Sequence, residues 1–222
     1  MAAVRTRGQR AGLTRQAVLE AALRLVDQEG LKALSMRRLG AELGVEAMTL
    51  YHHVPNKTAL LDGVIERVVA EAVPPEFGTA AWREVLSAYA HALNAALDAH
   101  PNTVPLLLSR PAMTPRLLRT LEAVVEMLHE AGFPLPRALD VAYGLTAFVV
   151  GHATAQAGGV GGADTLAALD PEAYPSLVGA ARAAGEDAAR TRFGFALDAL
   201  LSGFEGELSA ASTATAPASA SE

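Results

Sequence analysis

Hydrophobic positions recur every three or four residues along most of the chain, and this period predicts α-helices. In the first helix Leu19, Ala22, Leu23 and Val26 form one apolar stripe, and Gly30 is placed to end it. Further helices are expected at residues 57–72, 82–100, 114–131, 136–156, 171–183 and 186–208. No segment shows the apolar–polar alternation of a strand, so the pattern predicts an all-α protein.

Residues 35–57, SMRRLGAELGVEAMTLYHHVPNK, differ from the longer helices in containing two short helices and a turn. Ser35 is placed as the N-cap of the first short helix, and Gly44 can adopt the left-handed conformation that ends it. Pro55 and Asn56 end the second helix and cap the next. This is the layout of a helix-turn-helix, whose second helix enters the major groove of DNA.

Changes in composition divide the chain into four predicted segments. Pro74, Pro75 and Gly78 mark the boundary between a small helical head and a larger helical body, and the last residues are of low complexity. We therefore expect a disordered basic arm at 1–13, a DNA-binding domain at 14–73, a second helical domain at 74–208 and a disordered tail at 209–222.

The helix at 136–156 is apolar on nearly every side, which is typical of a core, an oligomer interface or a membrane. Asp140, His152 and a high content of alanine and glycine argue against a membrane span. The glycine run at 158–162 lacks the GK[ST] of a phosphate-binding loop. We therefore expect no membrane contact and a flexible loop near a ligand pocket.

Charge is distributed unevenly around the net value of −6. Residues 1–70 carry ten basic and seven acidic side chains, whereas residues 71–222 carry eight and seventeen. A basic front on an acidic body suits a protein that touches phosphates with one end, although chance variation of surface charge gives the same pattern. The arginines of the arm, Arg5, Arg7 and Arg10, could follow the DNA or simply keep the segment soluble.

Several chemistries are disfavoured by the composition. The chain has no cysteine, which excludes disulfides and cysteine-ligated zinc. No apolar segment follows the N-terminal arginines, so we expect a cytoplasmic protein without a secretory signal. The histidines of the body are scattered among aliphatic residues without a nucleophile–base pair, so we expect no enzyme, no metal and no cofactor; these are His91, His100, His129 and His152.

The run LGVEAMTLYHHVPNK, together with its surroundings at 14–68, resembles the tetracycline repressor (TetR) family of transcriptional regulators. A weaker resemblance to the tetracycline-repressor branch continues through Trp82, Ser109-Arg110-Pro111 and Ala131-Gly132-Phe133. It implies a homodimer, joined through the helices at 136–156 and 186–208, that binds a palindromic double-stranded DNA operator. The domain at 74–208 would bind a small-molecule inducer. Most such regulators are repressors, but activators share the same head, and a helical ligand-binding protein that has lost DNA binding is a further alternative.

The resemblance also assigns DNA contacts. Arg37 matches a position that reaches a base, and an arginine can bind guanine through two hydrogen bonds. Met36, Ala47 and Met48 offer apolar contact, such as to thymine methyl groups. Further matches to positions that hold phosphates or bases are Thr49, Tyr51, His52, His53 and Lys57. Of these, Tyr51 could instead only pack the recognition helix.

The inducer pocket is expected between the helices at 82–100, 104–109, 114–131 and 136–156. Arg110 and His152 are the better candidates for the lining, because a polar group in an apolar core needs a partner. The full set of candidate lining residues, most of which could equally be ordinary core, is Leu86, Tyr89, Leu93, Leu106, Arg110, Met113, Leu121, Val124, Phe148 and His152. The family's histidine and glutamate that position magnesium-chelated tetracycline fall on Leu106 and Ala155, and its drug-binding asparagine falls on Tyr89. Because this chelation chemistry is missing, the expected inducer is more apolar.

Overall fold

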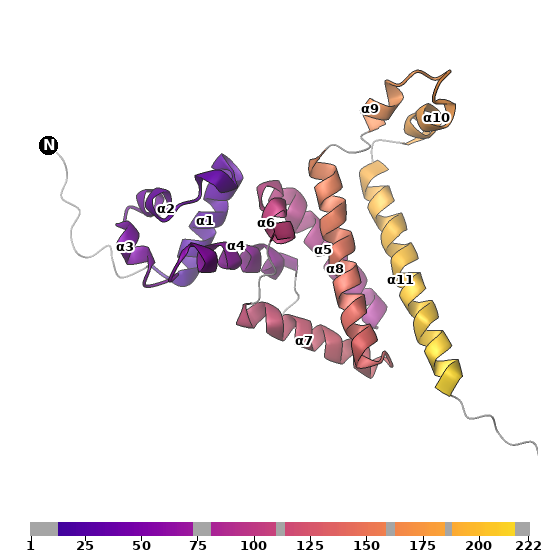
Figure 1. Cartoon of the computed structure of the whole chain (residues 1–222), viewed down its shortest axis with the longest axis horizontal. Coiled ribbons are helices and arrows are strands. Elements are labelled where there is room, and N and C mark those ends of the chain that lie inside the picture. The colour runs from indigo at the N-terminus through magenta and orange to yellow at the C-terminus, as the bar shows by residue number, and fades with distance from the viewer. Residues whose placement is uncertain (1–12, 73–80, 110–113, 159–162, 185–187, 216–222) are drawn as a thin grey trace, which may run out of the picture.

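The computed structural model describes residues 13–72, 81–109, 114–158, 163–184 and 188–215 (Figure 1). Within these ranges the chain forms helices and turns without a strand, which confirms the all-α prediction. Several sequence predictions lie outside the described residues: the arm up to residue 12, the boundary at 73–80, residues 159–162 of the glycine run and residues 216–222 of the tail.

The head consists of α1 (Arg15–Glu29), a 3-10 turn (Leu31–Ala33), α2 (Met36–Leu43), α3 (Ala47–Leu50) and α4 (Lys57–Ala72). Three side-chain caps fix where its helices begin. Thr14 Oγ1 accepts from the N–H of Ala17 at 3.1 Å, and Ser35 Oγ accepts from that of Arg38 at 3.2 Å. Asn56 Oδ1 accepts from the N–H of Ala59 at 2.8 Å. The caps predicted at Ser35 and Asn56 are therefore confirmed.

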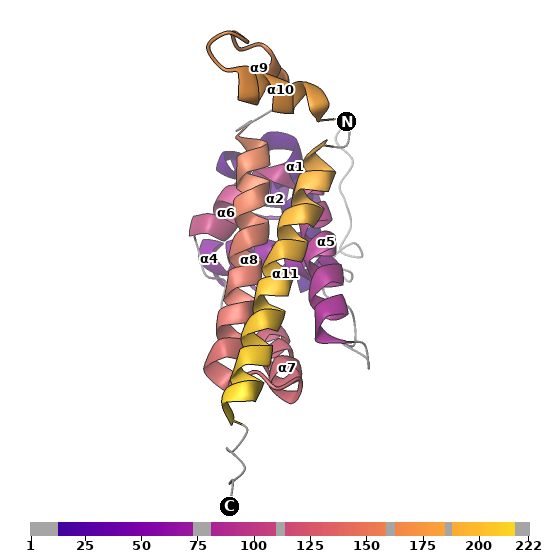
Figure 2. The same cartoon turned by 90° about the vertical axis from the view of Figure 1, so that its right-hand side faces the viewer.

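The body contains α5 (Trp82–Ala99), a 3-10 turn (Pro101–Thr103), α6 (Val104–Ser109), α7 (Pro115–Glu130), α8 (Leu135–Ala157), α9 (Ala163–Ala167), α10 (Pro175–Ala183) and α11 (Ala188–Thr215). The long helices α8 and α11 run side by side on the side of the molecule away from the head (Figures 1 and 2). The helix α6 lies between the head and this pair, α5 passes behind α8, and α7 runs below α4 to the lower end of α8 (Figure 1).

The last helix is longer than the sequence pattern predicts. We expect a disordered tail from residue 209, but α11 continues to Thr215, so that prediction is wrong for residues 209–215. The segment SAASTAT is rich in alanine and contains no glycine or proline, which makes it compatible with a continuing helix. Ser209 Oγ also donates to the carbonyl of Glu205 at 3.0 Å.

The helix α8 is long and apolar enough to cross a membrane, with a mean hydropathy of 1.2. A core helix of a water-soluble protein meets the same criterion, and 39% of its most apolar stretch is buried inside this chain. Its buried side includes Val141, Leu145 and Val149, which join the main hydrophobic core. Length and composition alone are therefore weak evidence for a span.

Candidate nucleic-acid interface and ligand cavity

The turn between α2 and α3 depends on two glycines. Gly44 has a φ of +67°, the left-handed conformation predicted for it. Gly40 lies where the chain returns against α2: a Cβ atom there would lie 2.8 Å from the carbonyl oxygen of Val45 and 3.2 Å from the nitrogen of Ala47. Both neighbours are backbone atoms, which cannot move aside as a flexible side chain could. The absence of a Cβ atom at Gly40 therefore allows α3 to pack closely on α2.

The head presents a surface formed by the start of α2, by α3 and by the turn that follows. Arg37, His52 and Lys57 are exposed on it, and Ala47, Thr49 and His53 are partly exposed. Met48 and Tyr51 are 70% and 42% exposed, and they are the exposed large hydrophobic side chains of the described head. Apolar groups beside basic ones suit a surface that meets both phosphates and base edges.

Two adjacent arginines on α2 have different environments. Arg38 Nη1 lies 3.0 Å from Glu42 Oε2, and the same guanidinium hydrogen-bonds to Glu29 of α1, which lowers the pKa of that carboxyl group. Arg37 is exposed and has no ion pair with any described residue. Arg38 therefore holds α2 against α1, and Arg37 is left to reach outward.

Met36 does not lie on this surface, and its predicted DNA contact is not supported. It is only 8% exposed and belongs to the hydrophobic core. Met36, Leu39 and Leu43 are spaced at i, i+3 and i+7, so they share the inward stripe of α2. The same spacing in the sequence could have identified Met36 as a core residue.

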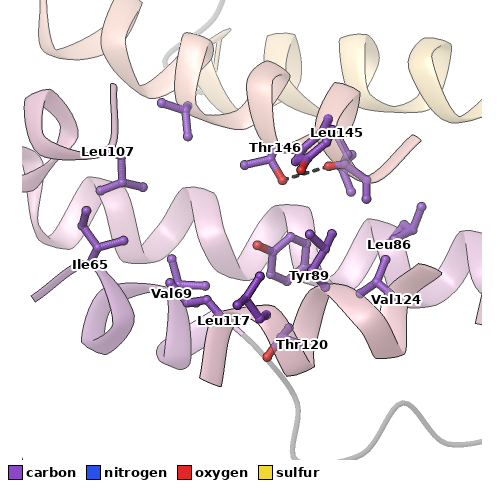
Figure 3. Close-up of a pocket in the computed structure, with 15 residues that line it drawn as sticks. Ile65, Val69, Leu86, Tyr89, Leu107, Leu117, Thr120, Val124, Leu145 and Thr146 are labelled. Carbon is purple, nitrogen blue, oxygen red and sulfur yellow. Dashed lines mark hydrogen bonds between the residues drawn. The ribbon is translucent and has the colours of Figure 1, made fainter. Parts of the chain in front are cut away.

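A cavity of about 270 Å³ lies between α4, α5, α6, α7 and α8 (Figure 3). Ile65 and Val69 of α4 line one end, and Leu86 and Val124 line the other (Figure 3). The remaining lining residues are Tyr89, Leu107, Leu117, Leu118, Thr120, Leu121, Ala142, Tyr143, Leu145, Thr146 and Val150. None of the lining residues is charged.

Hydroxyl groups are the polar side-chain groups in this lining. Burial raises the pKa of Tyr89 to about 12, and its hydrogen bond with the Thr146 side chain opposes the rise. Thr146 itself donates to the carbonyl of Ala142 at 2.9 Å. Thr120 and Tyr143 bring further hydroxyls from α7 and α8. An uncharged, mostly aliphatic cavity with a few hydroxyls favours a neutral ligand that carries a small number of polar atoms.

The structure brings together four of the predicted lining residues, Leu86, Tyr89, Leu121 and Val124. Arg110 and Met113 lie outside the described residues. Four others do not line the cavity: Leu93, Leu106, Phe148 and His152. Leu93 and Leu106 are buried in the hydrophobic core. Leu107, which follows Leu106 by about 100° around α6, lines the cavity instead.

Phe148 and His152 face away from the cavity, toward α11. Both rings pack on Phe193, with centroid distances of 5.3 and 5.0 Å, and His91 of α5 packs on it from another side at 5.2 Å. Burial lowers the pKa of His152, whereas the negative charge of Asp98 raises it. The partly exposed His152 therefore packs in an aromatic cluster rather than in the cavity.

The part played by α4 in the cavity was missed by sequence analysis, which assigned this helix to the head. Leu60, Val64 and Val68 pack in the head core, as one apolar stripe predicts. A second stripe, Leu61, Ile65 and Val69, lies beside it, and its last two members line the cavity. Two adjacent stripes at a spacing of four residues are the signal that could have identified a helix with two packing partners.

Comparison with known proteins relates both parts of the chain to one group. Residues 18–64 match the family model described as bacterial regulatory proteins, tetR family. Residues 74–208 match the one described as tetracyclin repressor-like, C-terminal domain.

Individual proteins agree with these matches. The chain is 36% identical over 152 residues to the HTH-type transcriptional repressor DrrR1 of Streptomyces coeruleorubidus, a match that covers 68% of this chain and spans only 56% of that relative's length. It is 30% identical over 204 residues to the class D tetracycline repressor of Escherichia coli, which covers 90% and 93% of the two chains. The solved structure of the Streptomyces coelicolor TetR family protein ActR in complex with actinorhodin has a TM-score of 0.73 at 30% identity, with coverage of 89% and 97%.

Proposed function

The chain belongs to the TetR family of bacterial regulatory proteins, and we propose that it is a transcriptional repressor that a small, largely apolar molecule releases from its DNA operator. The observation that carries this proposal is the double role of α4. The helix begins at Lys57, directly after the exposed surface of the head, and its residues Ile65 and Val69 line the cavity. A ligand in the cavity therefore touches the helix that supports the DNA-facing surface.

DNA binding is assigned to the exposed head residues. Arg37 would read a base edge, and Lys57 would hold a phosphate. Met48 and Tyr51 offer apolar contact, and the smaller or polar contacts would come from Ala47, Thr49, His52 and His53. Met36 is left out of this interface because it is buried.

We propose a homodimer formed through α8 and α11. The helix α8 is apolar on nearly every side, and α11 exposes the large aromatic side chain of Phe195, at 76% exposure. Exposed apolar surface of this kind is typical of a protein–protein interface. A two-fold dimer presents its two heads to a palindromic site, with the recognition helices about 34–36 Å apart. The protein would act in the cytoplasm, where bacterial DNA is located.

The inducer is proposed to be neutral and largely apolar. The lining contains no charged residue, and Leu106 and Ala155, at the positions of the family's chelate-binding histidine and glutamate, do not line the cavity. The relative ActR is known in complex with actinorhodin, which makes that compound a suitable first probe. Binding releases DNA only if the ligand prefers the arrangement of α4 in which the heads do not fit the operator.

Two alternative functions are a transcriptional activator and an enzyme. A transcriptional activator would use the same head, but DrrR1 and the class D protein are both named repressors, which favours repression. We propose no enzymatic activity, because the cavity is lined by aliphatic residues and hydroxyls without an activating base.

A mobility-shift assay with DNA from upstream of the protein's own gene tests the proposal. We expect a salt-sensitive complex that a random duplex of equal length does not form. Actinorhodin should release the DNA, and tetracycline with Mg²⁺ should not. Absence of a sequence-specific complex would overturn the regulatory function, whereas release by Mg²⁺–tetracycline would overturn the proposed ligand class.

A further inference from the structure

Three helices end at one histidine of the junction between head and body. His100 follows the last residue of α5, Asp27 lies in the last turn of α1, and Glu71 lies in the last turn of α4. His100 Nδ1 is 2.9 Å from Asp27 Oδ2, and His100 Nε2 is 3.4 Å from Glu71 Oε2. The imidazole therefore connects the head to the body through both of its nitrogen atoms.

This arrangement favours the charged form of the ring over the neutral one. A neutral imidazole has a single N–H group and presents a lone pair at its other nitrogen. With Asp27 on one side and Glu71 on the other, a neutral ring would direct that lone pair at a carboxylate oxygen. The doubly protonated imidazolium donates a charge-assisted hydrogen bond to Asp27 through Nδ1 and holds its second N–H 3.4 Å from the Glu71 carboxylate as an ion pair.

The surroundings of the ring also favour a positive charge. The carbonyl end of a helix carries partial negative charge, and α1, α4 and α5 have no basic residue in their last turns. Besides His100, the other basic side chain among the described residues at this junction is Arg67, one turn earlier on α4, whose Nη1 lies 3.5 Å from Glu71 Oε1. Asp27 Oδ1 is buried without a hydrogen-bond partner among the described residues. The Asp27 carboxylate thus depends on His100 for compensation of its charge.

A neutral side chain completes the contact between the same elements. Asn102 Nδ2 donates to the carbonyls of Val26 and Asp27 at 3.0 and 3.1 Å. These bonds cap the end of α1 from the 3-10 turn that follows His100. They do not change with pH, so the proton-dependent part of the junction lies in His100.

We propose that His100, as an imidazolium, is the positioning residue that locks α1 and α4 of the head to the body, and that this lock is released by loss of a proton. The lock deepens the proposed function, on which its effect on DNA binding rests. Movement of α4 at the cavity displaces Glu71 from His100 and so reaches Asp27 of α1. Histidine changes its charge between pH 5 and 8, so the coupling between cavity and head varies within this range.

The first test needs neither DNA nor ligand. Nitrogen-15 NMR of labelled histidine in the full-length protein at about pH 6 should show both ring nitrogens of His100 protonated, with the resonances assigned through His100→Gln. Urea unfolding is then compared at about pH 6 and about pH 8. The unfolding equilibrium constant of the wild type should rise about tenfold more than that of His100→Gln, because the carboxylates of Asp27 and Glu71 contact the charged ring only in the folded protein.

Two further variants make this test specific. His129→Gln removes an exposed histidine of α7 and should keep the pH dependence of the wild type. Glu71→Gln keeps the size of the side chain but removes one negative charge, and it should reduce the pH dependence without abolishing it. A neutral His100 at pH 6, or equal pH dependence in the wild type and His100→Gln, would overturn the proposal.

The second test uses the upstream DNA duplex. Between about pH 6 and pH 8, the change in DNA affinity should differ about fivefold between the wild type and His100→Gln. His52 and His53 are present in both proteins, so their contribution cancels. If both proteins bind the operator specifically and with the same pH dependence, the proposed role of His100 is refuted, and the proposed repressor function stands. If NMR and unfolding show the charged His100 but no specific DNA binding occurs, the proposed repressor function is refuted, and the proposed role of His100 stands.

Discussion

Val69 and Glu71 lie two positions apart on α4 and contact opposite partners: Val69 lines the cavity, and Glu71 lies 3.4 Å from His100. Two positions correspond to about 200° around a helix, so the two side chains leave α4 on opposite sides. We therefore expect a ligand that displaces α4 to move Glu71 at the junction with α1 as well as the residues at the head surface.

Arg37→Ala should reduce sequence discrimination without unfolding the head. Loss of a two-bond contact to guanine costs about 1–3 kcal/mol for the specific site and little for random DNA. Competition mobility shifts with operator and random duplexes measure the difference, and Arg116→Ala on exposed α7 is the matched control. An equal loss of affinity for both duplexes would show that Arg37 contacts only phosphate.

Gly40→Ala should destabilise the head, because the new Cβ would lie 2.8 Å from the carbonyl oxygen of Val45. Overpacking against backbone costs about 1–3 kcal/mol, measured as the free energy of unfolding in urea. Gly179→Ala in α10 is the control: no atom lies within 4 Å of its Cβ, so alanine should stabilise the helix by up to about 1 kcal/mol. Equal stability of Gly40→Ala and the wild type would contradict the close approach of α3 to α2.

Tyr89 should make the protein lose stability in alkali. Burial raises its pKa from 10.0 to about 12, so the unfolded chain releases this proton first and the free energy of unfolding falls as pH rises through that window. The loss is about 1.4 kcal/mol per pH unit. It should be absent in Tyr89→Phe and present in Tyr174→Phe, whose side chain is 51% exposed. Urea unfolding between pH 9 and 12 measures the difference, and identical pH profiles of the wild type and Tyr89→Phe would refute the raised pKa.

Val124→Trp should uncouple DNA binding from the ligand. The larger side chain occupies part of the 270 Å³ cavity, so the protein should bind the upstream duplex and resist release by actinorhodin. We expect at least a tenfold increase in the actinorhodin concentration that frees half of the DNA, which corresponds to about 1.4 kcal/mol. Glu126→Trp, on the exposed side of the same helix, should respond like the wild type. Normal release from Val124→Trp would place the ligand elsewhere.

The sequence by itself determined the local features of the head. Ser35, Gly44 and Asn56 cap or end helices as predicted, because each acts on backbone groups within three or four residues of itself. The periodic stripes likewise predict the helices and the all-α fold. These features require only short-range hydrogen bonds and helical geometry, which one segment of sequence contains in full.

Only the tertiary structure decided which apolar residues enclose a cavity and which fill the core. Leu106 and Leu107 are chemically alike, yet one is core and the other lines the cavity, because the choice depends on how α6 rotates against its neighbours. His100 and Asp27 are 73 positions apart, and no periodicity indicates that they meet. Contacts of this kind arise from the packing of whole helices, which short-range pattern does not encode.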